Sequence, residues 1–139
     1  MLFRSRTHFV GEIAPERIGA FLAGLDAFVF PTMAETFGLA AVEAANAGVP
    51  TVANDLPVLR EVLSYQGQPA AVFVDASDHS KFLAAVTSVL EDDALRASLR
   101  QSARGLKARY SVDTMVEEYV RIIDDAANDA GLAQEARPT

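Results

Sequence analysis

Apolar residues in the first part of the chain fall into two short runs separated by a helical stripe. Residues 8–10 form a β-prone run that Gly11 closes. Between 15 and 25 the apolar residues recur at helical spacing, and the proline that opens this segment suits a first helical position. Residues 26–30 are apolar almost throughout and end at Pro31, as expected of a strand covered on both faces. The pattern therefore predicts a strand, a helix and a second strand.

The middle of the chain repeats this alternation. Residues 38–47 are rich in Ala, Leu and Val, and Gly48 and Pro50 then supply a helix stop signal. Residues 51–54 resume an extended pattern. This segment predicts a second helix followed by a third strand.

Shorter elements follow the third strand. Residues 56–63 predict a short helix with Pro57 in its first turn, and residues 64–69 predict a turn-rich loop. The apolar, β-branched run at 71–74 predicts a fourth strand. The strands and helices therefore alternate as far as this point.

Helical stripes close the chain. Apolar residues recur at helical spacing within three segments, 82–90, 95–106 and 112–123, which predict three helices. The remainder, 130–139, is small and polar, and we expect it to be loose.

The alternation of strands and helices predicts the fold class. Strand, helix and strand in succession imply parallel pairing, so we expect an α/β, Rossmann-like parallel sheet of about four strands flanked by helices. Such sheets bind ligands at the carboxyl ends of their strands, where the loops that lead into the helices gather. The loop at 32–37 lies at this edge of the predicted sheet.

Composition narrows the classes of function. The chain has 139 residues, half of them hydrophobic, enough for one domain. A net charge of −7 and a pI near 4.7 argue against nucleic acid or an anionic membrane as the main partner. The chain has no cysteine and its two histidines, His8 and His79, lie far apart, so no metal site is expected. No apolar run is long enough for a membrane span and no signal peptide is recognisable, so we expect a cytoplasmic protein.

The predicted helix that starts near Gly38 offers a place for an anion. The first backbone N–H groups of a helix lack partners within the helix, and the helix dipole adds partial positive charge at the same end. Glycine allows a ligand to approach the backbone closely. The N–H groups from Thr36 to Leu39 could therefore hold a diphosphate without basic side chains.

Two carboxylates frame this helix start. Glu35 precedes the helix and Glu43 lies inside it, up to about 12 Å of helical rise further on. Carboxylates accept hydrogen bonds from vicinal hydroxyls, so the pair suits an extended ligand with two sugars joined by a diphosphate. The spacing alone also fits simpler readings, because a glutamate before a helix can favour its dipole and a glutamate within a helix can be solvated.

Read as one string, residues 30–53 carry a motif: FPTMAETFGLAAVEAANAGVPTVA. This string closely resembles the signature of the C-terminal domain of family 4 retaining glycosyltransferases of the GT-B fold. The shared features are a proline after the strand, a Glu-x-Phe-Gly-Leu turn, a second glutamate eight positions after the first, and Gly-x-Pro before the next strand. Flanking segments agree, and the resemblance extends from about His8 to Ile123.

The resemblance implies roles for particular residues. Glu35 would lie at the catalytic position, against the donor sugar and the transferred carbon, as a positioning and electrostatic residue rather than a general base. Glu43 would hold the ribose, and the loop at 11–13 would lie along the base, with Gly11 and Ile13 beside it. The residues whose backbone would contact sugar and phosphate are Thr36, Phe37, Gly38 and Leu39. The substrate would be a UDP- or GDP-linked sugar, with no further cofactor.

The resemblance also identifies parts of the family pattern that are absent. The family has an N-terminal Rossmann-like domain that supplies the acceptor site, and an Arg and a Lys that neutralise the diphosphate. Arg4 and Arg6 precede the matching region but do not continue the pattern. We therefore expect an out-of-frame or truncated start at 1–7, a partial nucleotide-sugar-binding domain at 8–129, and a loose tail at 130–139.

The sequence leaves three readings open. The first is a glycosyltransferase donor-binding half that holds a nucleotide-sugar and needs the missing N-terminal domain as its partner for transfer of a hexose. The second is a non-catalytic α/β module that uses the exposed sheet edge to bind another protein. The third is half of a GT-B sugar-nucleotide epimerase or phosphorylase.

Overall fold

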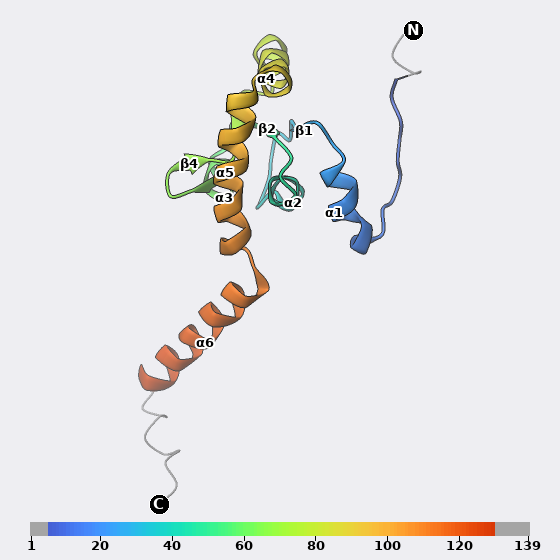
Figure 1. Cartoon of the computed structure of the whole chain (residues 1–139). Helices are drawn as coiled ribbons and strands as arrows, with labels where there is room; N and C mark the ends of the chain where they lie inside the picture. The colour runs from blue at the N-terminus through green and yellow to red at the C-terminus, as the bar shows by residue number, and fades with distance from the viewer. Residues whose placement is uncertain (1–5, 130–139) are drawn as a thin grey trace, which may run out of the picture.

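The computed structural model describes residues 6–129, and Figure 1 shows a parallel sheet with helices packed around it. In chain order the elements are α1 (Pro15–Ala23), β1 (Phe28–Phe30), α2 (Leu39–Asn46), β2 (Thr51–Asn54), α3 (Pro57–Val62), β3 (Ser64–Tyr65), β4 (Gln68–Pro69), β5 (Ala71–Val74), α4 (His79–Glu91), α5 (Asp93–Arg109) and α6 (Val112–Asp129). The α/β class and the parallel sheet flanked by helices are as the sequence predicted.

The central sheet has three strands in the order β1-β2-β5, all parallel. Phe28 of β1 pairs with Thr51 of β2, which in turn pairs with Ala71 of β5. All four residues of β2 are buried, as expected of the middle strand of a sheet with helices on both faces. The carboxyl ends of the three strands consequently meet at one edge.

Side chains alternate between the two faces of this sheet, as the period of a strand requires. Ala53 of β2 and Ala71 of β5 belong to a core with residues of α2, α3 and α5. Val52 belongs to the opposite core, with Val89 of α4 and Leu99 of α5. α5 therefore contributes to both cores, its first half on one face and its second half on the other.

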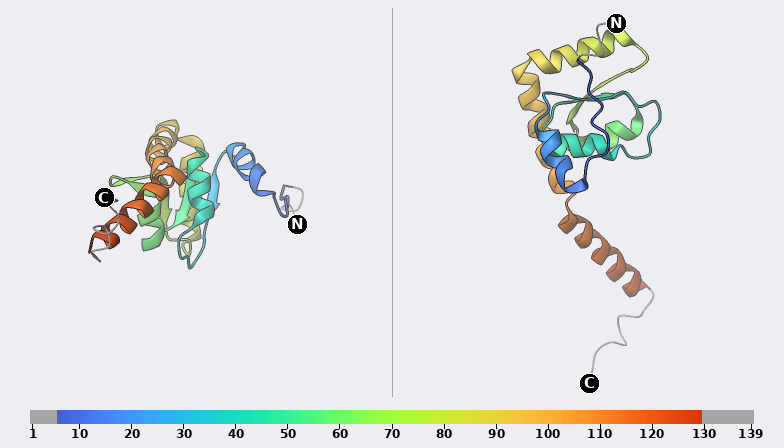
Figure 2. Two further views of the ribbon diagram at one scale, coloured as in Figure 1. Left: turned by 90° about the horizontal axis from the view of Figure 1, so that it is seen from below. Right: turned by 90° about the vertical axis from the view of Figure 1, so that its right-hand side faces the viewer.

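Small residues let α2 pack closely on several neighbours. Its buried residues are Ala41, Val42, Ala44 and Ala45. Ala44 contacts Leu22 of α1 in a separate small cluster, against which Phe28 of β1 also packs, so α1 lies against α2 beside the edge strand. Figure 2 shows α1 beside α2 and the preceding segment beyond α1.

α6 extends away from the rest of the fold in Figures 1 and 2. None of its described residues is buried. The apolar side chains of the helix are instead exposed: Val112, Met115, Val116, Tyr119, Val120, Ile122 and Ile123. The helix predicted from the apolar stripe at 112–123 is present, but this face has no partner among the described residues.

Two sequence predictions need correction. Residues 8–10 do not form a strand, and the sheet has three strands rather than about four. Phe9 is 96% exposed, and no strand of the described chain offers this segment a backbone partner. The turn-rich loop at 64–69 contains a two-stranded antiparallel hairpin of β3 and β4, whose turn includes Gly67 with φ of 77°. The expectations for residues 1–5 and 130–139 lie outside the described residues.

Candidate functional site

The loop between β1 and α2 lies at the carboxyl edge of the sheet and is tied to the neighbouring strand. The Thr32 hydroxyl donates a hydrogen bond to the Ala34 carbonyl at 2.8 Å, which folds the loop on itself. The Asn54 amide, at the end of β2, donates to the Thr32 carbonyl at 2.8 Å. The start of the segment that carries Glu35 is therefore held against the end of the central strand β2.

Gly38 begins α2 in a conformation that favours glycine. Its φ and ψ are 89° and 46°, in the left-handed region. Its carbonyl accepts hydrogen bonds from the N–H groups of Ala41 at 3.0 Å and Val42 at 3.1 Å, so the first turn is well formed. A Cβ at this position would also lie 2.5 Å from Cδ2 of Leu59, which is fully buried. Backbone conformation and packing both require glycine here.

No side chain caps the N-terminus of α2 in the described structure, and its first turn contains no acidic residue. The N-termini of α1 and α3 also lack a side-chain cap, whereas Asp78 caps α4 and Asp92 caps α5 through hydrogen bonds from the backbone at Lys81 and Leu95. A helix start without a side-chain cap keeps its N–H groups and its partial positive charge available to an anion. The arrangement at Gly38 is thus suited to phosphate.

The two glutamates lie on either side of this helix start in different environments. Glu35 is half-buried, and its Cγ lies 3.6 Å from the position of a Cβ at Gly38, so its side chain packs beside the start of α2. Glu43 is exposed, even though its helix neighbours are small and buried. The carboxylate of Glu43 is therefore open to solvent and does not need a buried partner.

Glu43 borders a groove of about 490 Å³ between α2 and the corner where α5 meets α6. Phe37 and Leu39 line the same groove beside the helix start, and Tyr110 and Met115 line its opposite wall. The Phe37 and Tyr110 rings meet edge to face, with centroids 5.6 Å apart. The groove is largely apolar, and Glu43 supplies a carboxylate to it.

Tyr110 is held in place from behind. Its hydroxyl donates a hydrogen bond to the Val62 carbonyl at 3.2 Å, and the Arg109 guanidinium lies 5.3 Å from its ring centroid. The ring that contacts Phe37 is therefore fixed to α3. Sequence reasoning did not single out Tyr110, because a tyrosine after a long helix carries no local signal of its spatial neighbour.

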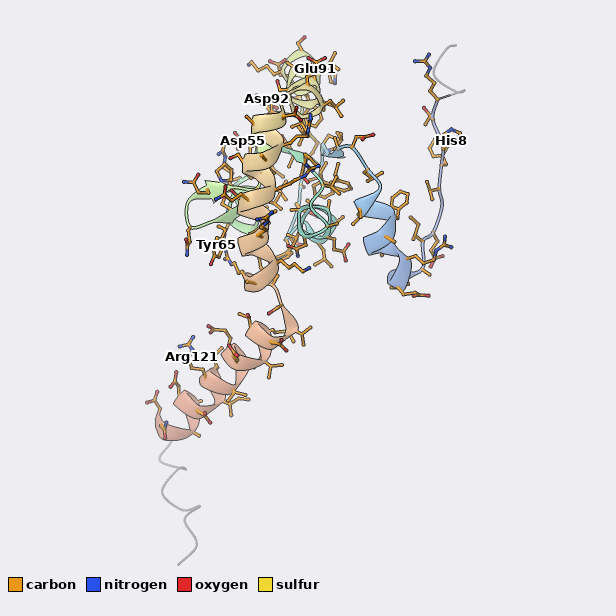
Figure 3. The ribbon with its side chains drawn as sticks, in the orientation of Figure 1. His8, Asp55, Tyr65, Glu91, Asp92 and Arg121 are labelled. Carbon is orange, nitrogen blue, oxygen red and sulfur yellow. The ribbon has the colours of Figure 1, made fainter. Side chains whose placement is uncertain are left out.

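Gly11 and Ile13 lie in a different part of the molecule. Ile13 lines a separate cavity of about 490 Å³ with Arg17 and Phe21 of α1, and neither Glu35 nor Glu43 borders it. Figure 3 shows His8 on the same N-terminal segment, on the far side of α1 from the sheet. The structure thus brings Phe37, Leu39 and Glu43 together but leaves the loop at 11–13 apart from them.

Two cations on the neighbouring helices α3 and α4 are already paired. The Arg60 guanidinium binds the Asp55 carboxylate and also lies 5.0 Å from the Phe73 ring centroid. The hydrogen bond from Arg60 holds the pKa of Asp55 below its ordinary value. Lys81 forms an ion pair with Asp78 at 2.9 Å. Neither cation is free to serve a phosphate without giving up its partner.

The described part of the chain, residues 6–129, contains no group of three or more His, Cys, Asp or Glu residues placed to hold a metal ion. Within the same residues no helix is both long and apolar enough to cross a membrane. The expectation of a site without a metal therefore stays a prediction.

The architecture and the helix start agree with a match to a family model, the glycosyl transferases group 1, over residues 2–106. The chain belongs to this family. That region contains β1, α2 and β2, the groove residues of α2, and the Glu35 loop. The resemblance of residues 30–53 to glycosyltransferases is confirmed at the level of this GT-B family.

Curated proteins with similar sequences include a mannosyltransferase and a glycogen synthase. The chain is 30% identical over 131 residues to a phosphatidyl-myo-inositol mannosyltransferase of Mycobacterium leprae (strain TN), covering 92% of this chain and 34% of the relative. It is 37% identical over 107 residues to a glycogen synthase of Mycobacterium tuberculosis (strain ATCC 25618 / H37Rv), covering 77% and 25%. The chain thus spans a quarter to a third of the length of these relatives.

A solved structure agrees on the fold. Sucrose-phosphate synthase from Thermosynechococcus elongatus superposes with a TM-score of 0.78 at 22% identity, covering 91% of this chain and 31% of that protein. At this identity the likeness concerns the fold alone. It shows that the three-stranded sheet and its helices are a recurring arrangement in a larger enzyme.

Proposed function

We propose that this chain is the donor-binding half of a retaining glycosyltransferase and holds a nucleotide-sugar at the start of α2. The observation that carries the proposal is the helix N-terminus at Gly38, which has no side-chain cap in the described structure and lies at the carboxyl edge of the sheet. Parallel α/β sheets bind ligands at this edge. Membership of the glycosyltransferase family supports a ligand that contains a sugar.

In this proposal the donor extends across the helix start. The diphosphate lies against the backbone from Thr36 to Leu39, where the helix dipole offsets its charge. Glu35 then accepts hydrogen bonds from the sugar and positions the transferred carbon. Glu43 binds the ribose hydroxyls from the groove side, which its exposure supports.

The base is assigned to the loop at 11–13, with Gly11 and Ile13 as its contacts. These residues do not border the groove next to Glu43 in the structure. The assignment therefore requires the exposed segment around Phe9 to move toward α2 when the donor binds. The segment around Phe9 pairs with no strand among the described residues, which is compatible with such a movement.

The proposed reaction transfers a hexose with retention of configuration. The bond between the anomeric carbon and the diphosphate oxygen breaks, and the acceptor hydroxyl forms the new glycosidic bond on the same face. The acceptor proton passes to a donor phosphate oxygen, so the products are a glycoside and a nucleoside diphosphate. Electrostatic stabilisation by Glu35 and the α2 N-terminus is the contribution of this chain.

The acceptor would come from a partner, an N-terminal Rossmann-like domain. The fraction of the relatives' length that this chain spans supports a further domain in the working enzyme. The exposed apolar face of α6 offers a surface for it. We further propose a cytoplasmic protein that needs no cofactor beyond the UDP- or GDP-linked substrate.

Calorimetric titration with UDP-glucose and GDP-mannose tests the site. We expect one of these donors to bind the wild-type chain, and Glu43→Gln to weaken its binding by about tenfold, a loss of about 1.4 kcal/mol. Glu91→Gln serves as the matched control, because Glu91 is exposed at the end of α4 and lies far from α2 in Figure 3. Its affinity should equal that of the wild type.

The same titration separates the alternatives. If neither donor binds, or Glu43→Gln and Glu91→Gln bind equally well, the donor site is wrong. A non-catalytic protein-interaction module would then account better for the exposed face of α6. Product analysis after reunion with an N-terminal domain distinguishes a transferase from half of an epimerase or phosphorylase.

A further inference from the structure

Asn54 is a buried polar residue at the carboxyl end of the central strand. Its exposed fraction is 4%, and its neighbour in β2, Ala53, is fully buried. A buried amide destabilises the fold unless its donor and acceptor groups find partners. The partners of Asn54 therefore indicate what this side chain does.

The Asn54 side chain joins three loops. Its Nδ2 donates to the Thr32 carbonyl at 2.8 Å, in the loop after β1. Its Oδ1 accepts hydrogen bonds from the N–H groups of Asp55 and Ala76, each at 2.9 Å, in the loops after β2 and β5. The carbonyl on one side and the two N–H groups on the other fix the orientation of the amide.

These contacts give the Glu35 loop two independent anchors. Thr32 holds the beginning of the loop through Asn54, and the Thr32 hydroxyl also bonds to Ala34. Gly38 holds the end of the loop through its close packing on Leu59. Glu35 lies between the two anchors, so releasing either one lets its carboxylate move.

We infer that Asn54 is a positioning residue that holds the loop carrying Glu35 in the orientation needed for the donor sugar. Its hydrogen bonds to Thr32, Asp55 and Ala76 are called the latch below. The latch itself follows from the hydrogen bonds, whereas its effect on the sugar rests on the proposed function. Asn54 touches no reacting atom in this scheme. It acts through Thr32 on Glu35 and leaves the start of α2, which Leu59 holds, in place.

Asn54→Asp is the sharpest test of the latch, because it changes one polar group without changing shape. An oxygen then faces the Thr32 carbonyl and repels it, while the other oxygen still accepts from Asp55 and Ala76. Asn54→Ser is the second variant, since it removes the bond to Thr32 without burying a charge. Asp55→Asn is the matched control, because it breaks the exposed pair with Arg60 on the same edge of the sheet.

Backbone NMR relaxation of the ligand-free chain measures the latch alone. We expect the order parameters of residues 32–36 to fall from about 0.85 in the wild type to below about 0.6 in both Asn54 variants, because the Thr32 carbonyl loses its partner. The order parameters of α2 should keep their wild-type values, and Asp55→Asn should leave residues 32–36 unchanged. Equal order parameters for residues 32–36 in all four proteins would overturn the latch.

Calorimetric titration then measures how loss of the latch changes the affinity for the nucleotide-sugar. The probes are UDP-glucose and UDP, and GDP-mannose and GDP. We expect both Asn54 variants to bind the nucleotide-sugar about tenfold more weakly and the matching nucleotide less than about threefold more weakly. This difference would not arise from a general loss of stability, which would weaken both ligands alike.

The two readouts separate the two proposals. Equal weakening for nucleotide and nucleotide-sugar would overturn the positioning role of Asn54 even if the latch loosens. Lower order parameters of residues 32–36 in the Asn54 variants without any binding by the wild type would overturn the proposed function while supporting the latch. Lower order parameters together with selective loss of nucleotide-sugar binding support both.

Discussion

Leu59 of α3 occupies the space that a side chain at Gly38 would need. A Cβ at Gly38 would approach Leu59 Cδ2 to 2.5 Å, and Leu59 is fully buried, so it cannot move aside without disturbing the core. The start of α2 is thereby pressed onto α3, and the backbone that would face the diphosphate has a fixed position.

Gly38→Ala should destabilise the chain and weaken donor binding. The left-handed backbone costs a non-glycine residue about 1–2 kcal/mol, and the clash with Leu59 adds to this. Gly48→Ala is the control, because Gly48 also has a positive φ, of 78°, but a Cβ there meets nothing within 4 Å. Urea unfolding should show a larger loss for Gly38→Ala than for Gly48→Ala, and equal losses would mean that Leu59 accommodates the methyl group.

Gly105→Ala should also destabilise the chain, although alanine normally favours a helix. A Cβ at Gly105 in α5 would lie 2.1 Å from Cδ1 of Tyr65, and Figure 3 shows Tyr65 beside α5. Gly19→Ala in α1 is the control, since a Cβ there meets nothing and should stabilise by about 0.5–1 kcal/mol. In a Tyr65→Ala background the effect of Gly105→Ala should change sign in thermal unfolding. A loss that persists there would assign the glycine another role.

Most of the fold follows from local patterns in the sequence. The helix that opens with Pro15, the middle strand at 51–54 and the helix that starts after Gly38 were all predicted within a few residues. These segments combine a clear apolar period with a proline or glycine at the boundary, and the two signals agree.

The strand predicted at 8–10 was wrong because a strand depends on a partner. The residues have the right composition, but the described chain provides no neighbouring edge for their backbone groups, and Phe9 stays exposed. The hairpin at 64–69 was missed for the opposite reason. Its strands of two residues each are too short to show an alternating pattern.

The candidate site also contains some features that the sequence could predict and others that it could not. Gly38 and its helix start could be predicted, because a glycine before an apolar helix is a local signal. Asn54 and Tyr110 could not, since their roles depend on Thr32 and Phe37, which are distant in sequence. An asparagine that ends an otherwise apolar strand was the one signal that could have identified Asn54.

Acid should weaken the first turn of α4. The backbone and side-chain hydrogen bonds from Lys81 hold the pKa of Asp78 below its ordinary value of 3.8. A lowered folded pKa gives stability that is present above the unfolded value and is lost as the pH falls through the folded one. Asp78→Asn keeps an N-cap acceptor but no longer titrates.

Urea unfolding between pH 7 and pH 2 checks this expectation. Wild type should be the more stable protein at pH 7, and the difference from Asp78→Asn should shrink below about pH 4. Asp75 also has a lowered pKa, through hydrogen bonds from Ser77, and the nearby Asp78 carboxylate raises that pKa, so the titration of Asp75 also differs between the two proteins. Parallel stability curves would show that the pair with Lys81 contributes nothing.

The exposed apolar face of α6 should make the isolated chain self-associate. Tyr119 and Ile123 are 62% and 63% exposed, and large apolar patches without a partner favour association. Tyr119→Gln with Ile123→Gln should reduce the mass seen by light scattering at high protein concentration. Unfolding should change by less than about 0.5 kcal/mol, because neither side chain is buried.

The salt dependence of self-association separates the attraction of this apolar face from the repulsion between the charges around it. The opposite side of α6 carries acidic residues such as Glu117 and Asp124, which repel their counterparts in a second copy. Salt screens this repulsion, so association of the wild type should strengthen between 50 and 500 mM NaCl, about a threefold change in Debye length. Glu117→Gln with Asp124→Asn is the control and should associate at least as strongly as the wild type. A wild-type chain that stays monomeric under all these conditions would show that the apolar face of α6 does not drive association on its own.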